Sequence, residues 1–219
     1  KNTNTVFMSK VLKFGGKSLA SLHNNTDILQ IINYHAELSS LIIVVSAIGN
    51  TTDILLELLR KAKNNEPYQE LLNELKHLNF YPKINTEDQF QLIENILQGV
   101  SLIQDYSTKV QDLLLAQGEL ISSKVITEIL NEKRYEAIFL DSTQLIKTDS
   151  YFGSANVNET LTEIAIKEQF SKINSSKLVV LGGFIGSNEN GEITTLGRNG
   201  SNLTAALIAK YTDAEEFLN

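Results

Sequence analysis

The sequence predicts an α/β protein, a three-layer αβα sandwich with a largely parallel sheet. Residues 41–45 and 178–181 are unbroken apolar runs of strand length, as expected for parallel strands buried on both faces. Short strands also recur in a fixed order, each followed by a glycine-containing polar loop and an amphipathic helix. Loops that follow parallel strands meet at one edge of the sheet, so a ligand site is expected there.

Composition narrows the classes of function. With 219 residues the chain can bury a core of enzyme size, and 19 basic against 26 acidic residues give a net charge of −7. This balance disfavours nucleic acid and anionic membranes as partners, because both need a basic surface. No apolar run reaches the roughly 18 residues of a membrane span. The absence of cysteine fits a cytoplasmic setting, and three histidines far apart predict no metal site.

A short disordered lead over residues 1–9 precedes the first expected strand, residues 11–14. Gly15 and Gly16 end this strand and lead into a helix over about 28–36. A strand, two glycines and a helix can cradle a phosphate with backbone N–H groups.

Lys13 stands one residue before the end of that strand. Its ammonium can reach the group that the glycines hold, although a lysine on an edge strand is the simpler interpretation. Gly16-Lys17-Ser18 imitates the end of a Walker A loop, but that motif requires a glycine where Val11 stands. A P-loop is therefore not predicted. A dinucleotide site is not predicted either, because no G-x-G-x-x-G follows the first strand.

The same order of elements repeats after residues 41–45. This strand runs into Ser46, and a polar loop containing Gly49 leads into a helix over 54–62. Thr51 or Thr52 can cap that helix, and a cap there is compatible with contact to a ligand. Because the loops after parallel strands share one edge, this loop and the first glycine loop should face the same crevice.

Residues 64–107 are expected to be helical without strands, an excursion from the sheet that Pro82 breaks into two helices. The helical stretch that follows contains Gly118 and Glu119. Glycine is costly inside a helix, and Glu119 has apolar neighbours. A carboxylate there can receive the ammonium group of a ligand; a solvated glutamate at a helix start is the alternative.

The second half of the chain supplies the remaining elements. Strands are expected at 136–141 and 178–181, and a hairpin at 184–194 turns through Asn188-Glu189-Asn190-Gly191. The other expected elements are a short edge piece at 145–148, a helix around 161–165, a last helix that ends near Tyr211, and a strand or helix at 214–218.

The predicted site is organised around residues 194–206. An extended lead-in breaks at Gly197, passes Arg198 and a second glycine, and enters an Ala/Leu-rich helix. The first N–H groups of a helix lack partners and its dipole is positive there, so this point suits an anion. A guanidinium fork also matches carboxylate or phosphate. The alternative is an ordinary turn with Ser201 as N-cap and the arginine in water.

Five motifs together resemble aspartate kinase, of the amino-acid kinase family, over nearly the whole chain. They are Lys13-Phe14-Gly15-Gly16-x-Ser18, Ser46-Ala47-x-Gly49 with Thr52, Gly118-Glu119, Gly182-Gly183-Phe184-Ile185-Gly186, and Thr195-Leu196-Gly197-Arg198-x-Gly200-Ser201. The resemblance implies a truncated amino-acid kinase fold, with an amino-acid kinase domain at 10–219 that holds the aspartate-binding lobe. It implies a nucleotide lobe that is incomplete and regulatory ACT domains that are absent. Gln98-Gly99-Val100 gives weak support for a bifunctional aspartokinase/homoserine dehydrogenase.

The implied reaction is phosphoryl transfer from ATP to the side-chain carboxylate of L-aspartate, which gives 4-phospho-L-aspartate for lysine, threonine and methionine biosynthesis. The resemblance also implies Mg²⁺ on the nucleotide phosphates and a homo-oligomer at full length. Catalysis then consists of positioning and electrostatics, because the acceptor is already a carboxylate. The implied substrate-binding residues are Ser46, Thr52, Glu119, Phe184, Arg198, Asn199, Gly200 and Ser201. The implied nucleotide-phosphate residues are Lys13, Phe14, Gly15, Gly16 and Ser18, and the catalytic positions are Lys13 and Asn202.

In these implied roles Arg198 and Ser201 clamp the substrate carboxylates, and Glu119 partners its ammonium. Asn202 departs from the family pattern, since it replaces an aspartate that orients the reactive lysines. We therefore expect slow or absent turnover unless another carboxylate substitutes. A non-catalytic, aspartate-sensing relative and an amino-acid kinase for another carboxylate stay open as alternatives.

Two further departures are milder. Lys17 replaces a threonine of the family pattern and can add charge near the phosphates or point into solvent. Asn199 replaces a glycine, and asparagine tolerates left-handed backbone better than most residues, so the turn can survive.

Overall fold

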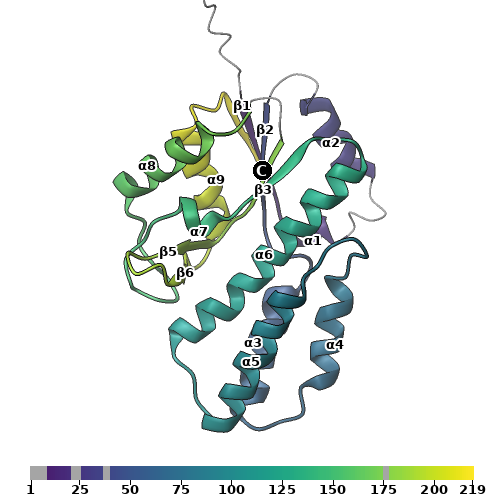
Figure 1. Cartoon of the computed structure of the whole chain (residues 1–219), viewed down its shortest axis with the longest axis vertical. Helices are drawn as coiled ribbons and strands as arrows, with labels where there is room; N and C mark the ends of the chain where they lie inside the picture. The colour runs from purple at the N-terminus through teal and green to yellow at the C-terminus, as the bar shows by residue number, and fades with distance from the viewer. Residues whose placement is uncertain (1–8, 21–25, 37–39, 175–177) are drawn as a thin grey trace, which may run out of the picture.

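A computed structural model describes residues 9–20, 26–36, 40–174 and 178–219. Its centre is a five-stranded sheet in the order β3-β4-β2-β1-β7, in which every neighbouring pair is parallel. Helices lie on both sides of the sheet (Figure 1), so the predicted α/β sandwich is confirmed. The strands are β1 (Ser9–Phe14), β2 (Ser40–Val45), β3 (Ala137–Leu140), β4 (Leu178–Gly182) and β7 (Glu216–Leu218).

Alternate residues of the central strands face two separate cores. Leu12 and Ile43 are partners across β1 and β2 and belong to one core, whereas Val11 and Ile42 are the next partners and belong to the other. Side chains alternate across a strand, so strands packed on both faces must be apolar throughout. This explains why residues 41–45 form an unbroken apolar run.

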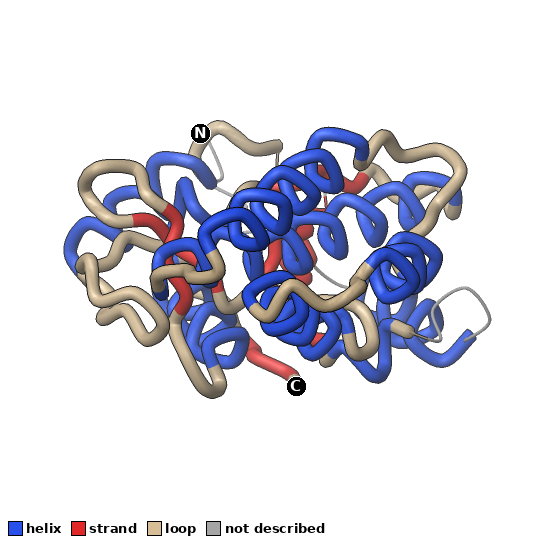
Figure 2. The backbone as a smooth tube through the Cα atoms, turned by 90° about the horizontal axis from the view of Figure 1, so that it is seen from below, coloured by secondary structure: helices blue, strands red, loops and turns tan. Residues whose placement is uncertain are grey.

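Each core is closed by its own layer of helices, and Figure 2 shows the strands enclosed between them. The first core packs against α2 (Thr26–Ala36), α3 (Thr51–Lys63), α4 (Gln69–Leu78), α5 (Glu87–Ile103) and α6 (Thr108–Glu132). The second packs against α7 (Ser142–Leu145), α8 (Glu159–Phe170) and α9 (Gly200–Tyr211). A single turn, α1 (Gly16–Leu19), follows β1.

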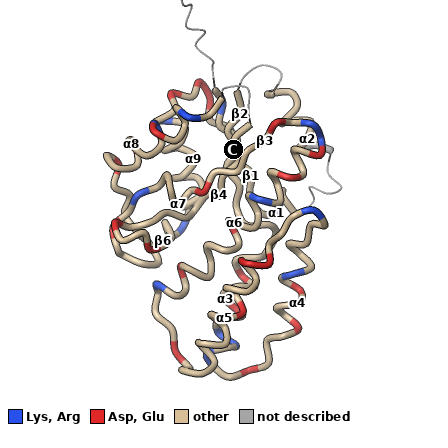
Figure 3. Tube along the Cα trace, in the orientation of Figure 1, with Lys and Arg blue, Asp and Glu red and all other residues tan. Residues whose placement is uncertain are grey.

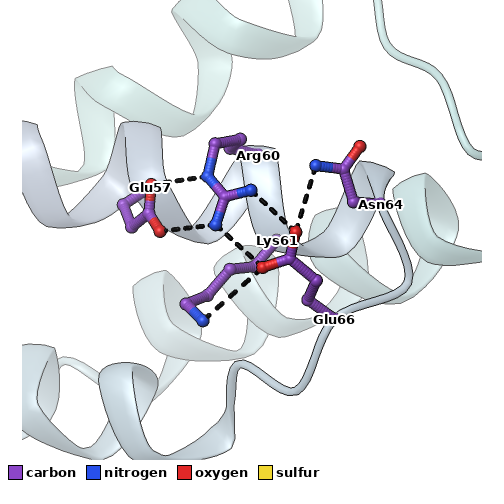
Figure 4. A network of polar contacts seen from close by, with 5 residues as sticks. All are labelled: Glu57, Arg60, Lys61, Asn64 and Glu66. Atoms are coloured by element: carbon purple, nitrogen blue, oxygen red, sulfur yellow. Dashed lines mark hydrogen bonds and ion pairs between the residues drawn. The ribbon is translucent and has the colours of Figure 1, made fainter.

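The segment 64–107 contains α4 and α5, with Pro82 between them. Together with α3 and the first half of α6 these helices extend below the sheet in Figure 1. Exposed ion pairs fasten the end of α3, where the Arg60 guanidinium contacts Glu57 at 2.8 Å and Glu66 at 2.7 Å (Figure 4). Because these groups are exposed, water and salt screen them and they add little to stability.

Residues 184–219 contain a predicted hairpin and a segment predicted as either a strand or a helix. Residues 185–187 and 193–195 form the predicted hairpin as β5 (Ile185–Ser187) and β6 (Ile193–Thr195). The segment 214–218 contains a strand, β7, which pairs with β1 and forms an edge of the sheet. Lys13 therefore lies on an inner strand, and its interpretation as an edge-strand lysine is wrong.

One predicted boundary and one predicted strand are also wrong. Strand β1 begins at Ser9, the last residue of the predicted lead, because Ser9 pairs with Ser40 on β2. The rest of the lead, residues 1–8, lies outside the described residues. The predicted edge piece at 145–148 is not a strand, since α7 ends at Leu145 and the residues after it form isolated bridges.

Acidic and basic residues are interspersed along the described chain rather than gathered by sign (Figure 3). Across the described ranges, no helix has both the length and the apolar composition that a bilayer span requires.

Candidate active site

The loops after β1, β2 and β4 meet the start of α9 at the carboxyl edge of the sheet. The register brings them together, since Phe14 pairs with Val45 and Val45 with Gly182, all at the ends of their strands. They enclose a cavity of about 320 Å³. The described residues that line it are Lys13, Ser46, Thr52, Glu119, Phe184, Gly197, Asn199, Gly200, Ser201 and Asn202.

Glu119 enters this cavity from the middle of α6, so it is not a solvated glutamate at a helix start. The adjacent Gly118 permits the close approach of α6 to α3, because a Cβ there would lie 2.9 Å from Thr51 Cγ2. Glu119 is 3% exposed, and its Oε2 has no hydrogen-bond partner among the described residues. Burial raises the pKa of the Glu119 carboxyl well above its ordinary value, and the Ala47 N–H that donates to it opposes this only in part. A buried carboxyl with an unpaired oxygen is ready for a donor or cationic ligand.

Hydroxyl groups line another part of the cavity. Ser46 Oγ donates to Ser201 Oγ at 3.3 Å, and Ser122 Oγ on α6 donates to the Ser46 carbonyl at 2.7 Å. Gly183 lets the end of β4 touch α9, since a Cβ on it would lie 2.6 Å from Ser201 Cα. The two serines thus come from different segments and are held side by side.

The turn before α9 uses left-handed backbone. Gly197 has φ 70° and Asn199 has φ 63°, so asparagine does adopt the conformation expected of it at this position. Helix α9 begins at Gly200 with Asn199 as N-cap, which rules out Ser201 as N-cap. Arg198 is exposed and is not among the described residues that line the cavity, so its role as a carboxylate clamp stays a prediction.

The start of α3 differs from the capping interpretation. Its N-cap is Asn50, and no side chain caps the helix. Thr51 is buried and its hydroxyl accepts a hydrogen bond from Asn79 Nδ2 at 2.9 Å. Thr52 does not cap the helix and is one of the residues that line the cavity.

A second hollow of about 500 Å³ lies on the other side of Lys13. Lys13 lines both spaces, and its Nζ lies 4.0 Å from where a Cβ on Gly15 would stand. Gly16 lines neither space; it packs on the loop after β2, where a Cβ would clash with the Ala47 carbonyl. The described residues around the second hollow are Leu12, Lys13, Phe14, Gly15, Ser18, Ile28, Ile31, Leu218 and Asn219.

Two adjoining spaces with a lysine between them suit the transfer of a group from one ligand to another. The model of the amino acid kinase family matches residues 8–219. The chain belongs to this family. It is 31% identical over 216 residues to the lysine-sensitive aspartokinase 3 of Escherichia coli strain K12, covering 93% of this chain and 46% of that protein. It is 27% identical over 224 residues to the bifunctional aspartokinase/homoserine dehydrogenase of Buchnera aphidicola, covering 94% of this chain and 27% of that protein.

The fold agrees with solved aspartokinase structures. The crystal structure of E. coli aspartokinase III in complex with aspartate and ADP matches with a TM-score of 0.83 and 30% identity, over 95% of this chain and 48% of that one. The lysine and aspartate complex of the same enzyme matches with a TM-score of 0.83 and 31% identity, over the same shares of the two chains. The chain thus spans about half the length of aspartokinase III and about a quarter of the bifunctional relative.

The family motifs did not point to Asp112, which supports the site from one side. This buried carboxylate on α6 accepts hydrogen bonds from the N–H groups of Gly153 and Thr195, both at 2.9 Å, and from the Thr195 hydroxyl at 2.8 Å. It ties α6 to the end of β6, two residues before Gly197. Its position seven residues before Glu119, on nearly the same helix face, was the available signal.

The resemblance implies Mg²⁺ on the nucleotide phosphates. Within the described ranges, His, Asp and Glu side chains do not gather in groups of three that could hold a metal ion. These residues offer no three-carboxylate cage, whereas Mg²⁺ on a nucleotide needs only one or two carboxylates beside the phosphates.

Proposed function

We propose that this chain is the aspartate-binding part of an aspartate kinase, which phosphorylates the side-chain carboxylate of L-aspartate with ATP. The observation that carries the proposal is the arrangement of Glu119 and Lys13 in one cavity, with Lys13 also bordering the next hollow. The ammonium of an α-amino dicarboxylate matches the unpaired oxygen of Glu119. Its carboxylates match Ser201 and the helix start at Gly200. The similarity to an enzyme solved with aspartate and ADP supports the same choice.

In the proposed reaction, an oxygen of the aspartate side chain attacks the γ-phosphorus of ATP, and the bond from that phosphorus to the β–γ bridging oxygen breaks. ADP leaves and 4-phospho-L-aspartate forms, as in the first step of lysine, threonine and methionine biosynthesis. The acceptor is already ionised, so no proton has to be removed. The Lys13 ammonium and the Gly15 N–H would stabilise the charge on the transferring phosphoryl oxygens.

Glu119 prepares the cavity for the ammonium group. Burial raises its carboxyl pKa, so the empty site favours the protonated form. An ammonium next to the carboxyl favours its ionised form, so a bound ligand would lower the pKa that burial raises. This makes Glu119 a substrate-binding residue rather than an acid or base of the transfer step.

The wider protein follows the same proposal. An amino-acid kinase domain occupies residues 10–219, and a completed nucleotide lobe and regulatory domains would account for the greater length of the relatives. We propose a cytoplasmic homo-oligomer for the full-length protein. The alternative is a full-length protein in which a dehydrogenase domain is fused to the kinase, as the name of the bifunctional relative indicates for that protein.

The direct test is aspartyl-hydroxamate formation by the full-length protein with ATP, Mg²⁺ and L-aspartate. Lys13→Met should lower the rate by at least about 100-fold, because a charge next to the transferring group is lost. Lys17→Met is the matched control, since Lys17 is exposed and lines neither hollow. An equal loss in both variants, or a rate in Lys13→Met equal to wild type, would refute the role of Lys13.

Asn202 favours a second candidate, a protein that binds aspartate without phosphorylating it. It lines the cavity with Lys13, and no ion pair joins Lys13 to a carboxylate of the described residues. If the native protein binds L-aspartate but forms no hydroxamate, and Asn202→Asp recovers the activity, the sensor is correct. Phosphorylation of a different acceptor in a panel of amino acids would instead favour a kinase for another carboxylate.

A further inference from the structure

Phe184, which lines the cavity, has a backbone conformation that side chains rarely adopt. Its φ is 71°, in the left-handed region, where a residue with a bulky side chain is a genuine outlier. Such residues persist where the surrounding structure holds them, and they gather at functional sites. Whatever holds Phe184 therefore also shapes the cavity.

Two backbone hydrogen bonds hold Phe184. Its carbonyl accepts from the Leu196 N–H at 2.8 Å, and its N–H donates to the Thr204 hydroxyl at 3.1 Å. Thr204 lies in α9 and is fully buried, and its hydroxyl also donates to the Gly200 carbonyl at 3.1 Å. A threonine bond to the carbonyl four residues earlier is common in helices. The hydrogen bond that the same hydroxyl accepts from Phe184, between β4 and β5, is the unusual part.

Phe184 and Gly200 also pack directly against each other. A Cβ on Gly200 would lie 2.9 Å from Phe184 Cδ2 and 3.1 Å from Phe184 Cα, so Phe184 rests directly on the first residue of α9. Phe184 and Gly200 both line the cavity, whereas Thr204 is not among its described lining residues. One hydroxyl group thus connects two lining residues that come from different segments.

We propose that Thr204 is a positioning residue that holds Phe184 in its left-handed conformation and thereby sets which acceptor amino acid the cavity admits. The proposal rests on the proposed function, since it takes the ligand to be an α-amino dicarboxylate. Without the hydroxyl, the Phe184 N–H loses its buried partner, and the backbone relaxes toward negative φ. The side chain then shifts, and the distinction between L-aspartate and L-glutamate, which differ by one CH₂ group, becomes weaker.

Thr204→Val tests this, because valine has the shape of threonine without the hydroxyl, and Thr204→Ser restores the hydroxyl. Calorimetry gives the ratio of the Kd values for L-glutamate and L-aspartate. One methylene is worth about 10–200-fold in a fitted pocket, so we expect the ratio to fall at least about fivefold in Thr204→Val and to return in Thr204→Ser. An unchanged ratio in Thr204→Val overturns the proposal.

Thr162→Val is the matched control. Thr162 is also fully buried in a helix, and its hydroxyl accepts from the Lys147 N–H at 3.0 Å and donates to the Lys147 carbonyl at 3.3 Å. It is not among the described residues lining the cavity, so its loss should lower stability without changing the ratio. A fall of the ratio in Thr162→Val equal to that in Thr204→Val also overturns the proposal, because the effect would then follow from lost stability.

Hydrogen exchange of the Phe184 amide, followed by NMR, needs no ligand. We expect this amide to be protected in the wild-type protein and to exchange at least about tenfold faster in Thr204→Val but not in Thr204→Ser. An unprotected amide in the wild-type protein overturns the proposal even if the valine variant does not fold, in which case Thr204→Ala takes its place. If the wild-type protein does not bind L-aspartate, the proposed function fails, and the exchange result alone decides whether Thr204 holds Phe184.

Discussion

Gly183→Ala should disturb the cavity by a distance that the structure gives directly. A Cβ on Gly183 would lie 2.6 Å from both Ser201 Cα and Ser201 Cβ, whereas ordinary contacts begin near 3.4 Å. Ser201 or the end of β4 must therefore move by about 0.8 Å. The backbone of Gly183 is not in the left-handed region, so alanine adds no backbone strain there. Overpacking of this kind typically costs about 1–3 kcal/mol in unfolding free energy.

The same shift should weaken ligand binding more than it weakens the fold. Displacement of a binding group by about 1 Å can cost up to 100-fold in activity, so we expect the Kd of L-aspartate to rise by about 10-fold or more. Urea denaturation measures the stability and calorimetry the affinity. Gly99→Ala in α5 is the control, because a Cβ there meets no atom within 4 Å and alanine favours a helix by about 1 kcal/mol. If Gly183→Ala matches wild type in both measurements, the contact between β4 and α9 does not position Ser201.

Three further variants test other parts of the structure. Burial raises the pKa of Glu119, so the native state keeps a proton that the unfolded chain releases, and the stability from this source falls as the pH rises above about 4.5. The melting temperature of Glu119→Gln should therefore rise relative to that of the wild-type protein from about pH 5 to pH 8. A difference in melting temperature that does not depend on pH would contradict this. Arg60 lowers the pKa of Glu66 to about 2, so the ion pair stabilises the folded state above the ordinary pKa of 4.5, and this contribution is lost as the pH falls toward 2. Because both groups are exposed, Arg60→Gln should leave the urea midpoint at neutral pH nearly unchanged. A large shift of the midpoint would show that the network in Figure 4 is stronger than its exposure predicts. Asp112→Asn should cost about 2–3 kcal/mol in urea unfolding, since an amide cannot accept all three hydrogen bonds; a loss no larger than that of the exposed Asp105→Asn would argue against this support.

The strands and the hairpin were predictable because their signals are local. A strand buried on both faces, such as β2, must be apolar throughout, and the hairpin turn places its glycine, Gly191, in the left-handed region. Residues 145–148 were not predictable in this way. Hydrogen bonds to residues distant in sequence decide their conformation, such as that from the Thr148 N–H to the Ser187 carbonyl at 2.9 Å.

The candidate site divides in a similar manner. Lys13, Glu119 and Ser201 stand in motifs with glycines that permit close approach, and the structure places all three in one cavity. Arg198 belongs to the same motif as Ser201, yet it is exposed and is not among the described residues that line the cavity. The left-handed φ of Phe184 follows from contacts with α9 across the fold, not from its neighbours in sequence.

Lys13 lines both hollows, so the charge of a ligand in one hollow changes the electrostatic attraction that a ligand in the other experiences. A negatively charged molecule in either space screens part of the ammonium charge from the other space. The second anion therefore meets a weaker attraction than the first, and the two should bind with negative cooperativity wherever no additional cation accompanies them.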